Sequence, residues 1–391
     1  MKVLVIHTSY KYKGGEDTVV AEEIKLLQSA GVTVKLLEFN NHKITLLKLL
    51  ALPFNLHSYF KTKTTLVNFK PDIVHVHNLH FGGSASVIYA VKRSKVPFVI
   101  TLHNYRLLCP SGILFHQGKP FLDSLQQKFP RKAVGLGVYK NSKLITFWLS
   151  LAIYLHNILG TWKTVNRYIV LSSHAKKIFL NSRLGLSESQ FVVKPNFVSA
   201  PKLEEQKVSG HFLYIGRLSE EKGIMLLLSV FSKCPYKIKI AGDGPLKEEV
   251  MQYGSRYPNI EFLGILNKTE VFALLQSCSA LVFPSIWFEG MPLTIIEAFA
   301  CGTPVISSKL GAMETMIINN YNGLHFEPQS EEDFRNKLDE WNNLNEEEKK
   351  VYRLNARKTY DDYYTPNKNL KQLLSIYNKV INEGKPLPVG L

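Results

Sequence analysis

The sequence of 391 residues has little cysteine, and its four cysteines form no C-x-x-C pair. They lie far apart along the chain, at Cys109, Cys234, Cys278 and Cys301. A disulfide-stabilised secreted domain or a structural zinc site would need closely spaced cysteines. The apolar stretch before His7 is also too short for the core of a signal peptide, so it predicts a first β-strand. We therefore expect a cytoplasmic protein with reduced thiols.

Acidic residues are scarce in the first half of the chain. Residues 1–200 contain 26 Lys and Arg against 8 Asp and Glu, whereas residues 201–391 contain 22 against 24. The formal net charge of +16 thus comes entirely from the first half. Such a one-sided positive field suits a polyanion or an anionic membrane surface. We favour the membrane surface, while lysines that merely solvate exposed helices remain the alternative.

Long hydrophobic runs are also few. Residues 144–162, LITFWLSLAIYLHNILGTW, approach the length that spans a bilayer. A spanning helix there would place two parts of one sheet on opposite sides of the membrane, so we expect a buried or membrane-touching helix instead. Residues 44–63 mix Leu and Phe with Lys and are the better candidate for an interfacial helix. Ordinary core packing is the alternative for both segments.

Short apolar strands alternate with helical patterns in two series, and this alternation predicts two parallel sheets covered by helices. The length alone predicts two or three domains. Between the series, residues 192–206 carry two prolines and a polar run typical of a linker. We expect an α/β protein with Rossmann-like domains at 1–198 and 199–365. In the first domain we expect strands at 3–7, 32–39, 73–77 and 98–103 and helices at 18–29 and 84–92. In the second domain we expect strands within 211–216, 236–242, 259–264, 280–285 and 304–308.

Two glutamates eight residues apart are the most informative feature of the chain. Glu289 follows an apolar strand, and Glu297 lies one turn into a helix that should begin near Leu293. Both carboxylates should therefore lie at the carboxyl edge of the second sheet, where α/β proteins bind ligands. Carboxylates there can accept hydrogen bonds from sugar and ribose hydroxyls.

Two further segments should lie at the same kind of edge. Arg217 and Lys222 follow the first strand of the second series, where they could neutralise a diphosphate as its charge grows during departure. Gly14 and Gly15 separate the first strand from the first helix, where backbone N–H groups can approach a phosphate. A purely structural glycine turn is the alternative for the second segment.

The sequence lacks both the G-x-G-x-x-G pattern and any D-x-D triplet. The first absence argues against a nicotinamide-dependent oxidoreductase. Without a D-x-D triplet, nothing in the sequence implies a metal ion that bridges a diphosphate, so we expect no metal. Arg217 and Lys222 would neutralise the diphosphate instead. A non-catalytic, basic nucleic-acid-binding protein is a further alternative, which we do not favour.

The ordered motifs resemble the group 1, family 4 glycosyltransferases of the retaining GT-B class, which include bacterial surface-polysaccharide enzymes. The resemblance extends through GGEDTVV, HVHN, TLHNYRLLCP, KPNFV, GRLSEEKG, AGDGP, VFPSIWFEGMPLTIIEAFACGTPVI and NGLHFEP. It implies two Rossmann-like domains that face each other across a cleft. It also implies that residues 366–391 form a helix packed back on the first domain.

The resemblance assigns roles to individual residues. It places Arg217 and Lys222 on the donor diphosphate, Glu289 on the donor sugar and Glu297 on the ribose hydroxyls. It also implies a histidine beside the transferred sugar, His103, and a glycine near the phosphates, Gly15. The residues whose backbone would contact sugar and phosphate are Gly290, Met291, Pro292 and Leu293. Asn104 and Arg106 are candidate acceptor contacts, whereas His75, His77 and Asn78 are more readily interpreted as structural.

We therefore expect a retaining hexosyltransferase that uses a UDP- or GDP-sugar. The expected acceptor is a saccharide or lipid-linked saccharide of bacterial polysaccharide biosynthesis. The basic first domain favours peripheral binding to the inner face of the plasma membrane. The donor sugar, the nucleotide base and the acceptor are left open by the motifs.

Overall fold

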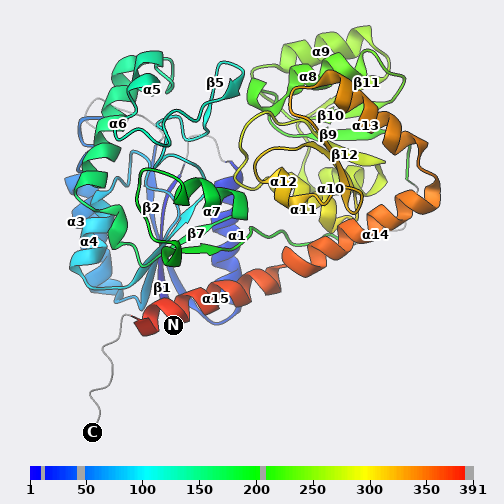
Figure 1. The fold of residues 1–391 in the computed structure, drawn as a ribbon. Coiled ribbons are helices and arrows are strands. Elements are labelled where there is room, and N and C mark those ends of the chain that lie inside the picture. The colour runs from blue at the N-terminus through cyan, green and yellow to red at the C-terminus, as the bar shows by residue number, and fades with distance from the viewer. Residues whose placement is uncertain (10–13, 42–48, 203–207, 384–391) are drawn as a thin grey trace. The chain divides into compact units, whose positions relative to one another are not determined.

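The computed structural model describes residues 1–9, 14–41, 49–202 and 208–383. The chain forms two compact units (Figure 1). Unit 1 comprises Met1–Leu114, Phe121–Pro195 and Asn367–Leu391, and unit 2 comprises Phe115–Pro120 and Asn196–Pro366.

Unit 1 is built on a sheet of six parallel strands in the order β2-β1-β3-β4-β7-β8. The strands are rich in buried β-branched residues, as expected where helices cover both faces of a parallel sheet. Strand order reverses beside β1, where Val5 is in register with Leu36 of β2 and His75 of β3. The strands are β1 Lys2–Ser9, β2 Thr33–Asn40, β3 Ile73–Val76, β4 Phe98–Leu102, β7 Arg167–Val170 and β8 Phe191–Val193. The helices include α1 Gly15–Ser29, α3 Leu56–Phe69, α4 Ser86–Arg93, α5 Arg131–Leu136, α6 Lys143–Ile158 and α7 Ser173–Leu180.

A helix from the far end of the sequence completes unit 1. This helix, α15 (Pro366–Glu383), begins at a proline, which suits the first turn of a helix because the missing N–H has no partner there. Its apolar stripe, including Leu373, Tyr377 and Val380, packs into one cluster with Val3 and Val5 of β1. The resemblance implied a helix over 366–391 packed on the first domain. This packing is confirmed for residues 366–383, whereas residues 384–391 lie outside the described part of the chain.

Unit 2 is a second sheet of six parallel strands, in the order β11-β10-β9-β12-β13-β14. This order reverses between β9 and β12, and such reversal points are where open α/β sheets bind ligands. The strands are β9 Phe212–Ile215, β10 Ile238–Ala241, β11 Ile260–Gly264, β12 Ala280–Phe283, β13 Val305–Ser308 and β14 Gly323–Phe326. The helices are α8 Ile224–Phe231, α9 Lys247–Arg256, α10 Lys268–Ser277, α11 Leu293–Ala300, α12 Met313–Met316, α13 Glu331–Asn343 and α14 Glu346–Tyr363.

A short hairpin from the first half of the sequence belongs to unit 2. It consists of β5 (Phe115–His116) and β6 (Lys119–Pro120), which pair antiparallel. Gln329 Nε2 donates a hydrogen bond of 3.0 Å to the carbonyl oxygen of Gly118 in its turn. The sequence patterns did not mark this hairpin, nor strands β7, β8 and β14.

The long apolar segment at 144–162 forms helix α6 and the turns that follow it. Leu149 and Ala152 of α6 are buried against Leu52 and Phe81, so one face of the helix belongs to the core. The opposite face leaves Leu144 82% exposed, with other apolar side chains beside it. Within the described residues, we find no helix with the length and apolar character needed to cross a bilayer.

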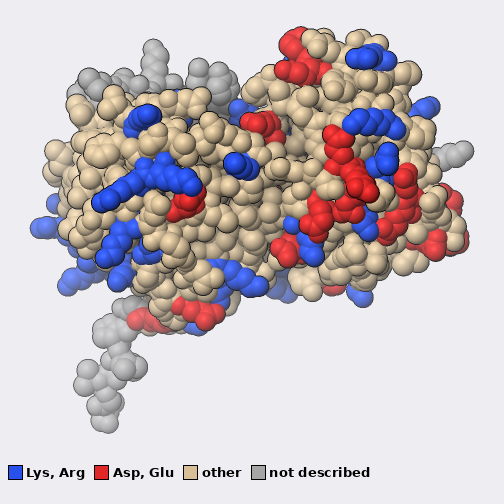
Figure 2. Space-filling view, turned by 45° about the horizontal axis from the view of Figure 1, so that its top comes forward, with Lys and Arg blue, Asp and Glu red and all other residues tan. Residues whose placement is uncertain are grey.

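The charge asymmetry of the sequence is visible on the surface. Lys and Arg spread over the visible face of unit 1, whereas Asp and Glu gather on unit 2 (Figure 2). All four cysteines are unpaired. Of the segment at 44–63, residues 44–48 lie outside the described part of the chain, and most of the remainder belongs to α3.

Candidate functional site

The predicted residues of unit 2 gather where its strand order reverses. The loop after β9 carries Arg217 and Lys222, and the loop after β12 carries Glu289. Because β9 and β12 are parallel neighbours, their carboxyl ends lie at the same edge of the sheet. The two loops are far apart in the sequence, but the sheet topology brings them together, and their residues make direct contact.

Glu289 and Lys222 form the centre of this site. Lys222 Nζ lies 2.6 Å from Glu289 Oε1, and the glutamate side chain is only 6% exposed. The same oxygen accepts hydrogen bonds from Ser285 Oγ at 2.8 Å and Trp287 Nε1 at 2.9 Å. The ammonium also lies 5.2 Å from the centre of the Trp287 ring, within range of a cation–π contact. The arrangement holds one carboxylate and one cation in fixed positions at the sheet edge.

Close approach of the two loops depends on Gly223, the residue after Lys222. Its φ is +73°, and a Cβ there would lie 2.0 Å from the carbonyl oxygen of Pro284. Ile286 N donates a 3.0 Å hydrogen bond to the carbonyl oxygen of Glu221, which joins the loops on the other side. Only glycine combines this φ with this packing distance.

Arg217 differs from Lys222 in its surroundings. Its backbone carbonyl accepts a hydrogen bond from Tyr214 OH at 2.9 Å, which fixes the turn after β9. Its side chain is exposed, and no ion pair of its guanidinium is found within the described residues. The guanidinium is therefore available to an anionic ligand, for which its planar fork is well suited.

Residues 290–293 lead from Glu289 into helix α11. Pro292 precedes the helix, and its side chain accepts no hydrogen bond. The N–H groups of the first turn therefore have no capping side chain as a partner. Glu297 lies within this helix and is only partly exposed. Burial raises its carboxyl pKa to about 7, against the opposing charge of Lys268. The structure thus distinguishes a paired, buried carboxylate at 289 from a carboxyl at 297 that titrates near neutrality.

In unit 1, Gly14 caps α1 and Gly15 is its first residue, so the helix begins three residues before the predicted start at 18. Gly14 N donates to Asp17 Oδ2 at 2.8 Å in a capping box, and Asp17 Oδ1 lies 2.8 Å from His7 Nε2. Glu16 beside them is largely buried, and burial and the charge of Asp17 raise its pKa to about 8. The Glu16 carboxyl is thus largely protonated at neutral pH.

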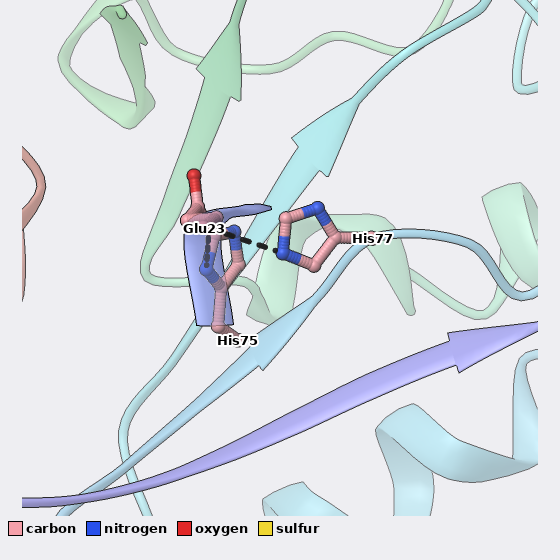
Figure 3. Close-up of side chains that lie close together, drawn as sticks. All are labelled: Glu23, His75 and His77. Carbon is pink, nitrogen blue, oxygen red and sulfur yellow. Dashed lines mark ion pairs between the residues drawn. The ribbon is translucent and has the colours of Figure 1, made fainter. Parts of the chain in front are cut away.

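His103 follows β4, and a second histidine joins it from the end of β3. His103 Nε2 lies 3.0 Å from His77 Nδ1, and the two rings are stacked. On its other side, His77 Nε2 lies 3.3 Å from Oε1 of Glu23, which comes from α1 (Figure 3). Burial, with the neighbouring His75, lowers the pKa of His77 to about 3. Burial also holds the pKa of His103 well below its usual value.

Glu23 carries no recognisable signal in the sequence, whose patterns favour a structural interpretation of His75 and His77. Glu23 Oε1 lies 3.2 Å from His75 Nδ1, and its Oε2 lies 3.0 Å from the buried Lys194 Nζ. Asn78, in contrast, has the structural contacts expected of it, because it donates to the carbonyl oxygen of Thr8. Nothing in the run AEEIK distinguishes Glu23 from an ordinary surface glutamate.

A cavity of about 120 Å³ opens beside His103 in unit 1. Its polar lining includes His77, His103, Asn104 and Arg106. Its apolar lining includes Leu52, Phe81, Leu149, Ala152, Ile153 and Trp162. A ligand with a polar part and an apolar part would match this lining.

Comparison with known proteins identifies the family. A model of Glycosyltransferase Family 4 matches residues 13–200, and a model of glycosyl transferases group 1 matches residues 198–359. The chain belongs to the group 1, family 4 glycosyltransferases. The division between the two matches falls where the chain passes from unit 1 to unit 2. Neither the oxidoreductase nor the nucleic-acid alternative finds support in these comparisons.

Two curated relatives match this chain over part of their own length. An uncharacterized glycosyltransferase of Methanocaldococcus jannaschii is 31% identical over 147 residues, which are 37% of this chain and 41% of the relative. The O-antigen chain mannosyltransferase C of Escherichia coli is 27% identical over 175 residues, 44% of this chain and 47% of the relative. The chain thus matches less than half the length of each.

Solved structures match over nearly the whole chain and show the GT-B fold. HepE of Anabaena, solved in complex with UDP, has a TM-score of 0.68 at 15% identity, and covers 97% of this chain and 100% of its own. The same protein in complex with UDP-glucose has a TM-score of 0.66 at 17% identity, with the same coverage. The GT-B class expected from the sequence is confirmed.

Proposed function

We propose that this glycosyltransferase moves a sugar from a nucleotide-diphosphate donor to an acceptor hydroxyl with retention of anomeric configuration. Unit 2 binds the donor, and unit 1 binds the acceptor and contributes His103 to substrate binding. The observation that carries the proposal is the Lys222–Glu289 pair at the reversal point of the second sheet, with the exposed Arg217 beside it in sequence. Anabaena HepE, which shares this fold, was solved with UDP and with UDP-glucose.

The residues of unit 2 suit a reaction in which the diphosphate leaves with both electrons of its bond to the sugar. Arg217 and Lys222 stabilise the charge that grows on the diphosphate, without a metal ion. Glu289 orients the sugar as it gains oxocarbenium character. The acceptor oxygen then attacks from the face that the diphosphate leaves, and its proton passes to the departing phosphate oxygen.

The nucleotide would lie along the start of α11. Backbone N–H groups at Gly290, Met291 and Leu293 can donate to phosphate and sugar oxygens, whereas Pro292 has none. Glu297, four residues into the helix, would accept hydrogen bonds from the ribose hydroxyls in its ionised form. Nothing in this recognition distinguishes UDP from GDP, so the base has to be found by experiment.

Thermal-shift measurements with UDP-, GDP- and ADP-sugars provide the first test. A ligand that binds only the folded protein raises its melting temperature in proportion to the logarithm of its concentration above Kd. We expect one nucleotide class to stabilise unit 2, and NMR of the product to show the donor's anomeric configuration. Inversion of that configuration, or no stabilisation by any nucleotide sugar, would overturn the proposal.

For the acceptor, we propose a lipid-linked saccharide at the inner face of the plasma membrane. Three observations support it. The first 200 residues carry a net charge of +18. The exposed face of α6 presents Leu144 and Ile158, which are 82% and 63% exposed. The cavity beside His103 has both a polar and an apolar lining. The E. coli relative named an O-antigen chain mannosyltransferase is consistent with a role in polysaccharide biosynthesis.

Vesicle flotation tests the membrane part of this proposal. We expect the protein to float with vesicles that contain anionic lipid and to stay behind with neutral ones, because its basic surface is attracted electrostatically. Leu144→Glu with Ile158→Glu should weaken flotation. The matched control is Val351→Glu with Leu354→Glu on α14, whose side chains are 55% and 63% exposed. Equal loss in both double variants would contradict the assignment of the membrane face to α6.

A further inference from the structure

The buried histidines of unit 1 form a chain with a defined direction. Glu23, on α1, stands at one end, and His77 lies next to it (Figure 3). His103 is at the other end, and it lines the cavity together with His77. The links are 3.3 Å between Glu23 Oε1 and His77 Nε2, and 3.0 Å between His77 Nδ1 and His103 Nε2. His103 is partly exposed, while Glu23 is 2% and His77 is 5% exposed.

The charge of Glu23 determines where each ring carries its proton. Although burial opposes ionisation, Lys194 and His75 hold the pKa of Glu23 well below its usual value, so the group is a carboxylate. His77 Nε2 lies 3.3 Å from the Glu23 carboxylate and has no hydrogen-bond partner among the described residues. The carboxylate would repel a bare nitrogen there, so this placement favours a proton on Nε2 and leaves Nδ1 as an acceptor. His103 must then donate from Nε2, and its Nδ1 is left without a proton.

A metal ion is a competing explanation for this cluster. Atoms of Glu23, His75 and His77 lie within 4.8 Å of one another, and these residue types can bind zinc. However, the ammonium of Lys194 already lies 3.0 Å from Glu23, and the side chain of Lys194 is 2% exposed. A divalent cation would place further positive charge next to the buried ammonium of Lys194. Repulsion between these charges would be strong, because the surroundings have low polarity. His75 Nδ1 is also occupied, since Tyr377 OH lies 2.6 Å from it.

We propose that Glu23 and His77 are positioning residues that hold the proton of His103 on Nε2. Nδ1 of His103 then accepts a hydrogen bond from a hydroxyl of the bound saccharide. This inference rests on the role proposed above for His103. It extends that role because it names the groups that fix the tautomer and restricts the partner of Nδ1 to a hydrogen-bond donor.

The rest of the network keeps Glu23 in place. Lys194 Nζ also lies 3.1 Å from Asn369 Oδ1, and Asn369 donates to the carbonyl oxygen of Pro195 at 2.7 Å. Asn369 belongs to α15, so this helix supports the carboxylate through Lys194. Tyr377 contacts His75, which does not belong to the proposed chain of Glu23, His77 and His103. Tyr377 is therefore a side branch of the network.

The tautomer can be measured directly by ¹⁵N NMR of protein labelled at histidine. The signals of His103 are identified by their loss in His103→Gln. We expect a protonated Nε2 and an unprotonated Nδ1, and a scalar coupling across the hydrogen bond between His103 Nε2 and His77 Nδ1. A proton on Nδ1 of His103 would overturn the proposal. So would one equivalent of zinc in the protein as purified.

Two variants test the chain itself. His77→Phe keeps a ring in the same place but removes both nitrogens, so the signals of His103 should shift toward a mixture of tautomers. Tyr377→Phe removes a contact of the branch, so the signals of His103 should stay as in the wild type. Melting temperatures show whether each variant is folded. Unchanged His103 signals in a folded His77→Phe protein would overturn the proposal.

Kinetics separate positioning from general support of the fold. Loss of an oriented partner should lower kcat about tenfold in His77→Phe, with little change in the donor KM. In Tyr377→Phe, both kcat and the donor KM should change by much less than tenfold. If the NMR result holds but His103→Gln retains full transfer, the network stands and the role proposed for His103 is wrong. If a folded His77→Phe loses the tautomer yet keeps full kcat, the positioning role is wrong.

Discussion

Lys222 Nζ and Glu289 Oε1 lie 2.6 Å apart, although 67 residues separate them in the chain. The contact exists because the loops after β9 and β12 meet where the strand order reverses. The cation proposed for the diphosphate and the carboxylate proposed for the sugar thus form one ion pair. Donor binding would therefore replace one ion pair by another, at a lower desolvation cost than for two unpaired charges.

Glu289→Gln and Lys222→Ala should each lower kcat by about 10²–10³, because each removes a preorganised charge aimed at the reacting groups. Steady-state kinetics with the identified donor measure the effect. Lys233→Ala is the matched control, since Lys233 forms an ion pair of the same 2.6 Å with Glu331 on the surface of unit 2. Near wild-type turnover in either of the first two variants would show that the residue is misassigned.

Glu297 should make nucleotide binding depend on pH around neutrality. Burial raises its carboxyl pKa to about 7, so the carboxylate forms as the pH rises from 6 to 8. If the ribose binds the ionised form, the affinity for UDP or GDP should increase about tenfold over this range. Calorimetry measures it, and Glu297→Gln provides the baseline for titration of the nucleotide itself. Equal pH dependence in wild type and variant would argue against a contact with the ribose.

Gly223 should tolerate alanine much less well than Gly264, although both have nearly the same φ, +73° and +72°. At Gly264 the added methyl meets nothing within 4 Å, so only backbone strain of about 1–2 kcal/mol is expected. At Gly223 it would meet the Pro284 carbonyl and force the two loops apart. This should cost about 3 kcal/mol and reduce transfer, because Lys222 is the adjacent residue. Urea unfolding compares the two variants, and equal costs would contradict the proposed packing.

The strands of the two sheets could be recognised from the sequence only in part. Runs such as VLVIH and ALVFPS are recognisable because a strand buried on both faces reads as continuous apolar residues. The short strands β7 (RYIV), β8 (FVV) and β14 (GLHF) went unmarked, since their identity depends on neighbours that complete the sheet. The hairpin at 115–120 is made of only two residues per strand, which no periodicity can reveal.

The same limit applies to the site. Glu289 and Glu297 could be placed at the sheet edge from their spacing. The sequence does not show that Glu289 pairs with Lys222 or that burial raises the pKa of Glu297. Glu22 and Glu23 are adjacent in sequence, yet Glu22 pairs with Lys25 near the surface while Glu23 is buried among histidines. They differ by a rotation of about 100° around α1. Only the packing of α1 on the sheet, and of α15 beside it, determines which of them faces the core.

Glu16 should make stability fall as the pH rises. Its folded-state pKa is raised to about 8, mainly by burial and then by Asp17, from an ordinary value of 4.5. The neutral form is therefore favoured by folding. Its contribution is complete below pH 4.5 and is lost as the pH rises through 8, by up to about 1.4 kcal/mol per pH unit.

We expect Glu16→Gln to unfold at higher urea concentration than wild type at pH 8.5, and at a similar one at pH 5. Glu22→Gln, on the same helix and more exposed, should follow the wild-type profile. Parallel pH profiles for Glu16→Gln and the wild type would indicate that this carboxyl is ionised in the folded protein.

The packing of α15 into the core of unit 1 has a consequence for synthesis. Most of unit 2 is one continuous stretch, Asn196–Pro366, and can close as soon as that stretch has left the ribosome. The sheet of unit 1 is translated first, yet its core lacks Leu373, Tyr377 and Val380 until α15 is made. Unit 1 is thus the first unit to be translated and the last to complete its core. Its basic sheet lacks the packing of α15 until the Asn196–Pro366 stretch of unit 2 has been translated. During that interval it would depend on chaperones more than unit 2 does.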